Sequence, residues 1–246
     1  MRAVNKITKT ITIIFILLIV AAVAYAAWSV YVRIPRMRED IQEKTAGAVA
    51  KWFPTTDEGG FSYRTEVDLK NGICGLKDLS VSEGVGRILN NINFKSYELR
   101  AESIDLDLNS LLKDQPLRII DMHGVNIEGD IDAADIVSYF TPEISGLTDI
   151  RMEYDDFTEK TTVTADIDEL KGIRVSIIGK WEVEGGALAL TGRKYRNPDG
   201  PVHGEVIDFI EEHTNITISF EVFDFTLEVA DFKFDGATLT VALVHK

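Results

Sequence analysis

Hydrophobic and polar residues alternate along most of the chain, and this alternation predicts a β-rich protein. In residues 61–70, apolar or β-prone side chains occupy the odd positions and polar side chains the even ones. Residues 99–109, 150–155, 163–167 and 175–183 also alternate, with the apolar side chains at the even positions in 104–109 and 150–155. A period of two places the apolar side chains on one face of a strand. Most strands are therefore expected to have one dry face and one solvated face.

Turn signals separate these segments. Asn71-Gly72, Glu184–Gly186 and Asp235-Gly236 each lie between two alternating runs and predict hairpins. Short helices are expected at 133–140, after Asp132 as a cap, and at 205–213. Together the patterns predict about ten strands and two or three short helices.

Before the first strand, the apolar spacing changes to steps of three and four residues. This spacing is typical of an amphipathic helix, and we expect one within residues 33–54, with Pro35 near its start and Pro54 at its end. Its apolar stripe, which we expect to pack on the following domain, consists of Ile34, Met37, Ile41, Ala48, Val49 and Trp52.

Residues 11–32 contain no charged side chain and follow a short basic segment, residues 1–10. About 20 apolar residues suffice for a helix to cross a bilayer. We therefore expect a single-pass anchor in the cell membrane, with residues 1–10 cytoplasmic and the domain formed by 55–246 extracytoplasmic. The alternative is a cleaved signal peptide, because Ala24-Tyr25-Ala26 has the form of a cleavage site. Both interpretations export the domain.

These elements define the expected fold class, which is α+β and mainly β. An N-terminal transmembrane helix precedes a strongly curved antiparallel sheet, and the sheet is wrapped on the long amphipathic helix and the short helices. Strands with one apolar and one polar face favour antiparallel pairing, and about 200 residues suffice for one domain with a sizeable core.

The charge distribution argues against one class of partner, the nucleic acids. The chain has a net charge of −14, but residues 1–38 carry six basic residues and no acid, so residues 39–246 carry −20. A nucleic-acid-binding domain needs a basic face, and no nucleic-acid partner is expected. The single cysteine, Cys74, excludes an internal disulfide and lies in an apolar stretch, where a small buried side chain is the simpler interpretation.

No catalytic signature is present, and we predict that the protein is not an enzyme. The nucleophile motif of serine hydrolases is missing, and His123, His203, His213 and His245 are scattered. The acidic strand face with Asp105 and Asp107 lacks the spacing of a calcium loop, as does Asp155-Asp156. We therefore expect no catalytic residue, no metal and no cofactor. A hydrolase that uses a carboxylate pair stays open as a minor alternative, because 40 acids supply many pairs.

Four segments carry a resemblance to a known family: Ser103–Leu112, Pro116–Ile120, Val125–Ile131 and Ala134–Phe140. Their order, a strand, a short step, an extended run and a short helix, resembles the bacterial LmeA-like phospholipid-binding family, as do the last hairpin and the N-terminal hydrophobic segment. The chain departs from that family by lacking prolines between 205 and 246. The resemblance implies a curved sheet like that of tubular lipid-binding domains, an apolar groove for acyl chains and a role in envelope lipid handling.

The expected function is therefore that of a membrane-anchored extracytoplasmic lipid-binding protein, with a phospholipid or glycolipid of the membrane as its partner. The alternative is a non-enzymatic envelope adaptor that binds another protein through a sheet edge or the acidic face. Aromatic residues are the candidate lining of the groove, although each also suits an ordinary core. They are Trp181, Phe209, Phe220, Phe223, Phe225, Phe232 and Phe234.

Overall fold

The computed structural model describes most of the chain. The described residues are 18–26, 28–29, 34–89, 92–113, 118–137, 147–167, 172–197, 200–213 and 216–245. The chain divides into two compact units, residues 1–48 and residues 49–246.

In the first unit, residues 18–26 are helical, and helix α2 (Ile34–Trp52) begins at the predicted position. The predicted anchor, residues 11–32, lies partly outside the described residues. Within the part of the chain that is described, no helix is both long and apolar enough to cross a bilayer.

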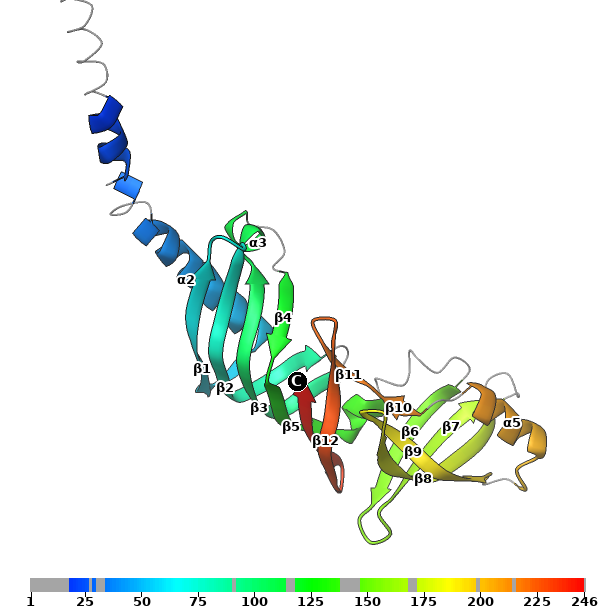
Figure 1. Cartoon of the computed structure of the whole chain (residues 1–246). Coiled ribbons are helices and arrows are strands. Elements are labelled where there is room, and N and C mark those ends of the chain that lie inside the picture. Colours follow the sequence, from blue (N-terminus) through cyan, green and yellow to red (C-terminus); the bar gives the residue numbers. More distant parts are fainter. Residues whose placement is uncertain are drawn as a thin grey trace, which may run out of the picture. The chain divides into compact units, whose positions relative to one another are not determined.

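The second unit consists almost entirely of antiparallel strands, which confirms the mainly β prediction (Figure 1). One group of eight strands forms the first sheet: β1 (Thr55–Asp68), β2 (Ile73–Leu89), β3 (Ile92–Asp107), β4 (Ile119–His123), β5 (Val125–Asp132), β11 (Phe220–Val222), β12 (Phe225–Asp235) and β13 (Thr238–His245). Five strands form the second sheet: β6 (Leu147–Asp155), β7 (Lys160–Ile167), β8 (Ile173–Glu184), β9 (Ala187–Arg196) and β10 (Thr217–Ile218). Two further helices are α3 (Leu108–Leu112) and α5 (Gly204–His213).

The first sheet is completed by the end of the chain. Its strand order is β1-β2-β3-β5-β13-β12-β11, with β4 also paired to β3. Strand β13 pairs with β5 along its whole length, from Thr238 opposite Asp132 to His245 opposite Val125. The second sheet, in the order β10-β9-β8-β7-β6, is thus inserted in the sequence between strands that are neighbours in the first sheet.

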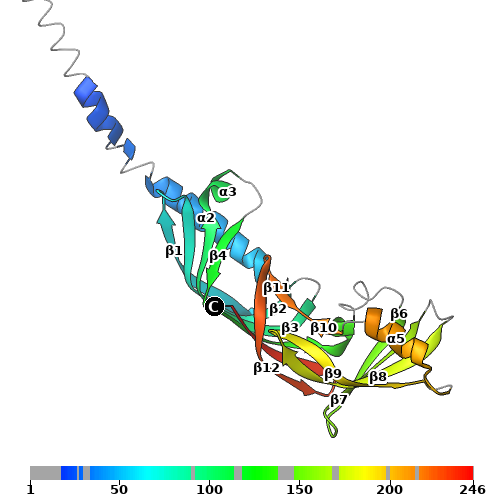
Figure 2. The same cartoon turned by 45° about the vertical axis from the view of Figure 1, so that its right-hand side comes forward.

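The first sheet curls strongly, as Figures 1 and 2 show. Its longest strands, β2 and β3, lose regular register at three places between Val81 and Leu89. Such bulges bend a strand and increase its twist. At one of them Gly84 lies opposite Tyr97, and a Cβ at Gly84 would overlap the tyrosine ring. The Tyr97 hydroxyl donates a hydrogen bond of 3.2 Å to the carbonyl oxygen of Pro54, which fixes the segment that follows α2.

The observed elements differ from the predicted ones in two instructive places. The extended run predicted at 117–131 is split into β4 and β5 by Gly124, whose φ of 59° is left-handed. The single strand predicted at 216–223 is also split. Its two halves, β10 and β11, belong to different sheets, so the prediction of one continuous sheet was too simple.

Candidate functional site

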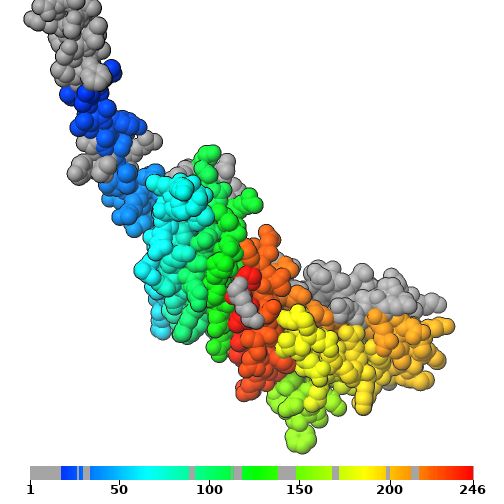
Figure 3. All heavy atoms as spheres, in the orientation of Figure 1, coloured from blue at the N-terminus to red at the C-terminus, as the bar shows by residue number. Residues whose placement is uncertain are grey.

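The two sheets meet where β12 passes the hairpins of the second sheet (Figure 3, red beside light green and yellow). Two hydrogen bonds cross this junction. The amide of Val229 donates to the carbonyl oxygen of Gly186 over 2.8 Å, and the amide of Gly236 donates to a carboxylate oxygen of Asp156 over 3.0 Å. Gly186 has a φ of 85°, a conformation that a side chain would strain. Turn residues of the second sheet are therefore held directly against β12.

Between these two hydrogen bonds lies a group of four aromatic rings. The ring of Phe234 on β12 stacks on Tyr154 of β6, with centroids 4.7 Å apart and planes inclined by 24°. Trp181 of β8 is also stacked with Phe234, at 6.1 Å and 22°. Phe232 meets Phe234 edge-on at 6.4 Å. Aromatic pairs in these geometries are favourable beyond the area that they bury, so the rings join the two sheets.

A bulge in β12 brings Phe232 and Phe234 to this position. Val229 pairs with Leu243, and Asp231 pairs with the adjacent residue of β13, Ala242. Ala230 is therefore an extra residue without a partner in β13. The alternation of β12 shifts by one at this point. Val229 and Phe234 consequently share the apolar face of the sheet, although one has an odd and the other an even number.

The four rings line a pocket of about 570 Å³. Ligand pockets commonly measure about 300–1,000 Å³ and are often found where two structural layers meet. Two of the rings belong to the buried part of the lining, because Trp181 and Phe234 are each only 6% exposed. The remaining lining residues are charged and exposed: Asp156, Glu159, Lys180, Lys233 and Asp235. The pocket is therefore amphipathic, with an aromatic interior and a rim that carries both signs of charge.

The charged rim affects the tyrosine. The pKa of Tyr154 is raised above its ordinary value, first because burial disfavours the phenolate and then because Glu159, Asp156 and Asp155 repel it. Lys180 forms an ion pair with Glu159 at 3.2 Å, which neutralises part of that negative charge. The local potential at Tyr154 thus favours positive over negative groups.

One carboxylate organises the turn that borders this pocket. Asp155 accepts hydrogen bonds from the amide of Phe157 at 3.0 Å and from the Thr158 hydroxyl at 2.7 Å. These bonds lower the pKa of Asp155, the hydroxyl bond most strongly. The turn presents Phe157 to solvent with 96% of its surface exposed.

Four of the seven candidate groove residues lie outside this pocket. Phe220 is fully buried on β11, and Phe209 is half-buried on α5. Phe223 packs in the turn after β11, with its ring 5.0 Å from Trp52 and 5.9 Å from that of Phe53. Phe225 meets the imidazole of His245 at 5.6 Å. The structure brings Trp181, Phe232 and Phe234 together at one pocket and distributes the other four over other parts of the second unit.

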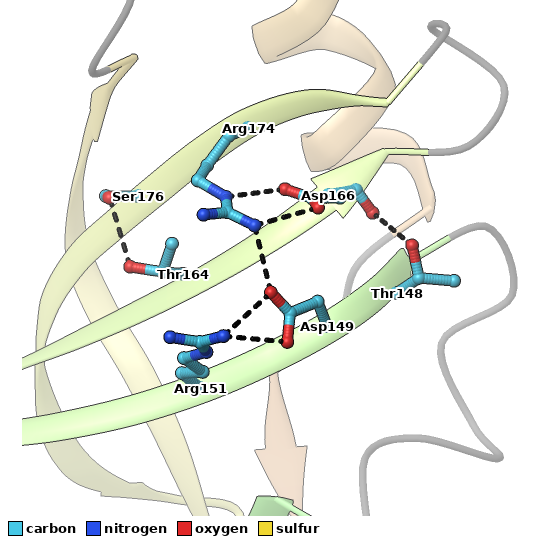
Figure 4. A network of polar contacts seen from close by, with 7 residues as sticks. All are labelled: Thr148, Asp149, Arg151, Thr164, Asp166, Arg174 and Ser176. Carbon is cyan, nitrogen blue, oxygen red and sulfur yellow. Dashed lines mark hydrogen bonds and ion pairs between the residues drawn. The ribbon is translucent and has the colours of Figure 1, made fainter.

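The outer face of the second sheet carries a polar network (Figure 4). Arg174 forms two hydrogen bonds with Asp166, at 2.7 and 2.9 Å, and a third with Asp149 at 2.9 Å. Asp149 also accepts from Arg151 at 3.1 Å. Two arginines and two aspartates balance in charge, so the network ties β6, β7 and β8 together and offers no excess charge to a ligand.

A second hollow, of about 310 Å³, lies on the first sheet over an acidic group. Glu83, Glu98, Glu128 and Asp130 line it. Asp130 accepts 2.7 and 3.3 Å hydrogen bonds from Thr240 and Ser96, so it is engaged within the sheet. Most of its lining consists of polar residues on strand faces, and Tyr97 is the one aromatic residue among them.

Several of the other residues considered from sequence have structural partners. Asp107 caps α3 by accepting from the amide of Asn109 at 2.9 Å, and Asp105 pairs with Lys77 at 3.4 Å. His123 lies 3.0 Å from Asp121, and Cys74 is buried and unoxidised. Among the residues that are described, no three or more His, Cys, Asp or Glu side chains are grouped as metal ligands.

Six residues of the pocket lining were not among the groove candidates predicted from sequence: Tyr154, Asp156, Glu159, Lys180, Lys233 and Asp235. Tyr154 falls on the apolar side of the alternating segment 150–155, and the alternation alone gives it no further role. A signal did exist for Tyr154, since it precedes a turn with two aspartates and a glutamate. Its proximity to β12, some 80 residues later in the chain, was not visible.

Comparisons with protein-family models, with curated proteins and with solved structures gave no significant match for this chain.

Proposed function

We propose that this protein is a membrane-tethered, extracytoplasmic lipid-binding protein, which binds a phospholipid or glycolipid at the pocket between its two sheets. The pocket itself carries the proposal. Four aromatic side chains, two of them buried, and five exposed charged side chains line it. This arrangement matches the two ends of an amphipathic molecule. Apolar groups removed from water at the rings contribute about 0.8 kcal/mol per buried CH₂.

The N-terminal segment supports the tether. Residues 11–32 lack charged side chains. In the described part of this segment, Leu18, Ile19, Val20 and Val23 are all exposed apolar residues. Tyr25 and Trp28 follow, with ring centroids 6.1 Å apart, and such residues suit a membrane interface. A lipid layer would cover this surface, and a domain tethered there would stay close to its ligand.

The resemblance to the LmeA-like family agrees with this proposal but adds no independent weight, because it rests on patterns of hydrophobicity. We also propose that the curved sheet packs on the long amphipathic helix. Two buried residues of the second unit support this packing: Val49 in the last turn of α2, and Phe53 directly after the helix.

Lipid extraction tests the proposal. The full-length chain is purified from a bacterium in a maltoside detergent, and its bound lipid is quantified by mass spectrometry. Phe232→Asp places a charge in the pocket, and Phe61→Asp places the same charge on the half-exposed face of β1 as a control. We expect the wild type and Phe61→Asp each to bind one more lipid molecule per chain than Phe232→Asp binds. Equal lipid content in all three folded proteins would overturn the proposal.

One observation favours a second candidate, an adaptor that binds another protein. Strand β1 is 14 residues long and lies at the edge of the first sheet. Among the described strands, β2 is its only partner. An open edge can accept an added strand from a partner, although acids such as Asp57, Glu58 and Glu66 also protect edges from unwanted pairing. Proximity labelling or cross-linking through β1 would identify such a partner.

A further inference from the structure

The chemistry of the pocket rim indicates which end of a ligand enters it. We propose that the pocket binds a zwitterionic head group, in which an alkylated ammonium and a phosphate are joined by a short linker, as in phosphocholine. This inference rests on the proposed lipid-binding function and specifies its ligand. The shared chemistry occurs both in a lipid head group and in a free phosphate ester of choline.

The rings supply the site for the ammonium group. Tyr154, Trp181, Phe232 and Phe234 come from two different sheets and line the same pocket. A cation within about 6 Å of an aromatic centroid is attracted to the ring face, and alkylated ammonium ions are weakly hydrated enough to enter such sites. Neutral rings do not require the cation to be a hydrogen-bond donor.

The carboxylates add to this attraction. Asp156, Glu159 and Asp235 all line the pocket. Asp156 is held in place by the amide of Gly236 at 3.0 Å. The raised pKa of Tyr154, to which Glu159 and Asp156 contribute, indicates that these charges reach the aromatic side. A positive group beside Tyr154 would therefore be stabilised by rings and carboxylates together.

The lysines supply the site for the phosphate. Lys180 and Lys233 lie on opposite sheets and both line the pocket. Within the described residues, Lys233 forms no ion pair, whereas Lys180 forms an ion pair with Glu159. Ammonium groups bind phosphate as point charges. A purely anionic ligand would face three carboxylates, and a purely cationic one would face two lysines, so a ligand with both charges fits the rim best.

Calorimetry with three soluble probes tests the charge pattern. The full-length chain in a maltoside is titrated with phosphocholine, choline and glycerol phosphate. We expect phosphocholine to bind more tightly than either single-charge probe. Equal binding of phosphocholine and glycerol phosphate, or of phosphocholine and choline, would overturn the inference, as would no binding of phosphocholine.

Variants locate the site. Tyr154→Leu removes a ring at the pocket, and we expect phosphocholine binding to weaken by roughly three- to thirtyfold. Lys233→Glu is expected to weaken it by roughly fivefold or more, whereas the control Lys113→Glu, an exposed reversal at the end of α3, leaves it unchanged. Circular dichroism confirms that each variant is folded. Equal affinities for the Lys233→Glu and Lys113→Glu proteins would contradict the inference.

An experiment with lipid vesicles distinguishes the proposed lipid-binding function from the head-group inference. It also distinguishes a lipid head group from a free phosphate ester as the ligand. The chain is incubated with vesicles of phosphatidylcholine or of phosphatidylglycerol, and bound lipid is extracted with and without competing phosphocholine. Preference for phosphatidylcholine and displacement by phosphocholine support both proposals. Lipid bound without head-group preference or competition overturns the head-group inference alone. Phosphocholine binding without any bound lipid overturns the lipid function and supports a free phosphate ester as ligand.

Discussion

The rings of Tyr154 and Phe234 stack 4.7 Å apart although their strands belong to different sheets. Tyr154 closes β6, and Phe234 lies near the end of β12, so this contact fixes the orientation of the β6–β7 hairpin against the first sheet. Two hydrogen bonds flank it. The same contact forms part of the pocket lining, and the stability of the junction and the geometry of the pocket are consequently coupled.

The stacked pair should contribute to stability as a pair. Phe234→Ala is expected to lower the free energy of unfolding by about 3–5 kcal/mol, since the side chain is buried. In a double-mutant cycle with Tyr154→Ala, we expect a coupling energy of about 0.5–1.5 kcal/mol. Urea unfolding of the four proteins measures it. Additive effects would show that the stacking itself contributes nothing.

The bulge at Ala230 predicts a contrast between two deletions. Removing Ala230 leaves Phe232 opposite Val241 and keeps both phenylalanines on the apolar face, so the protein should fold and retain its pocket. Removing Lys233 places Phe232 and Phe234 on opposite faces, and we expect a loss of about 3 kcal/mol or more. Thermal unfolding compares the two deletions. Similar losses for both would refute the assignment of the bulge.

The turn between β11 and β12 contains two residues in the left-handed region. Phe223 has a φ of 50° and Asp224 one of 69°. The contacts of Phe223 with Trp52 and Phe53 hold it there. Asp224→Gly should raise the free energy of unfolding by about 1 kcal/mol because glycine adopts this conformation without strain. Asp208→Gly on α5 is the control. It should lower the free energy of unfolding, because glycine is unfavourable inside a helix. An unchanged or lowered stability of Asp224→Gly would contradict this account.

Acid should weaken the second sheet through Asp166. Its pKa is lowered, chiefly by the hydrogen bonds from Arg174. A carboxyl with a lowered pKa in the folded state stabilises the protein above its unfolded pKa and loses that contribution as pH falls through its folded pKa. Denaturant midpoints should therefore fall from about pH 4 downward. Asp166→Asn should be less stable than wild type at neutral pH and should approach it in acid. Parallel profiles would exclude this role.

Phe157 predicts a change in function without a change in stability. Its side chain is 96% exposed, so Phe157→Ser should alter the free energy of unfolding by less than about 0.5 kcal/mol. If this turn contacts the membrane from which lipid is taken, uptake of lipid from vesicles should slow by about tenfold although the N-terminal tether is intact. The rate at which labelled lipid moves from vesicles to the chain measures this. An unchanged rate would place the membrane contact elsewhere.

Local patterns in the sequence determined most of the secondary structure. The period of two predicted the strands around residues 61–70, 99–109 and 175–183, because an alternating strand buries one face wherever it lies. The glycine turns at Asn71-Gly72 and Asp235-Gly236 followed from backbone conformations that few other residues adopt. The end of α2 before Pro54 followed in the same way, since proline cannot continue a helix.

Strand pairing and the pocket were decided only by tertiary structure. Alternation shows that a strand has an apolar face but not which strand it pairs with. The sequence did not reveal that β13 joins β5 or that β10 and β11 divide between two sheets. The bulge at Ala230 set which phenylalanines of β12 point inward, and long-range packing brought Tyr154 to Phe234. Only three of the seven aromatic candidates line the pocket. The sequence could not show which three, because their meeting depends on contacts between residues far apart in the chain.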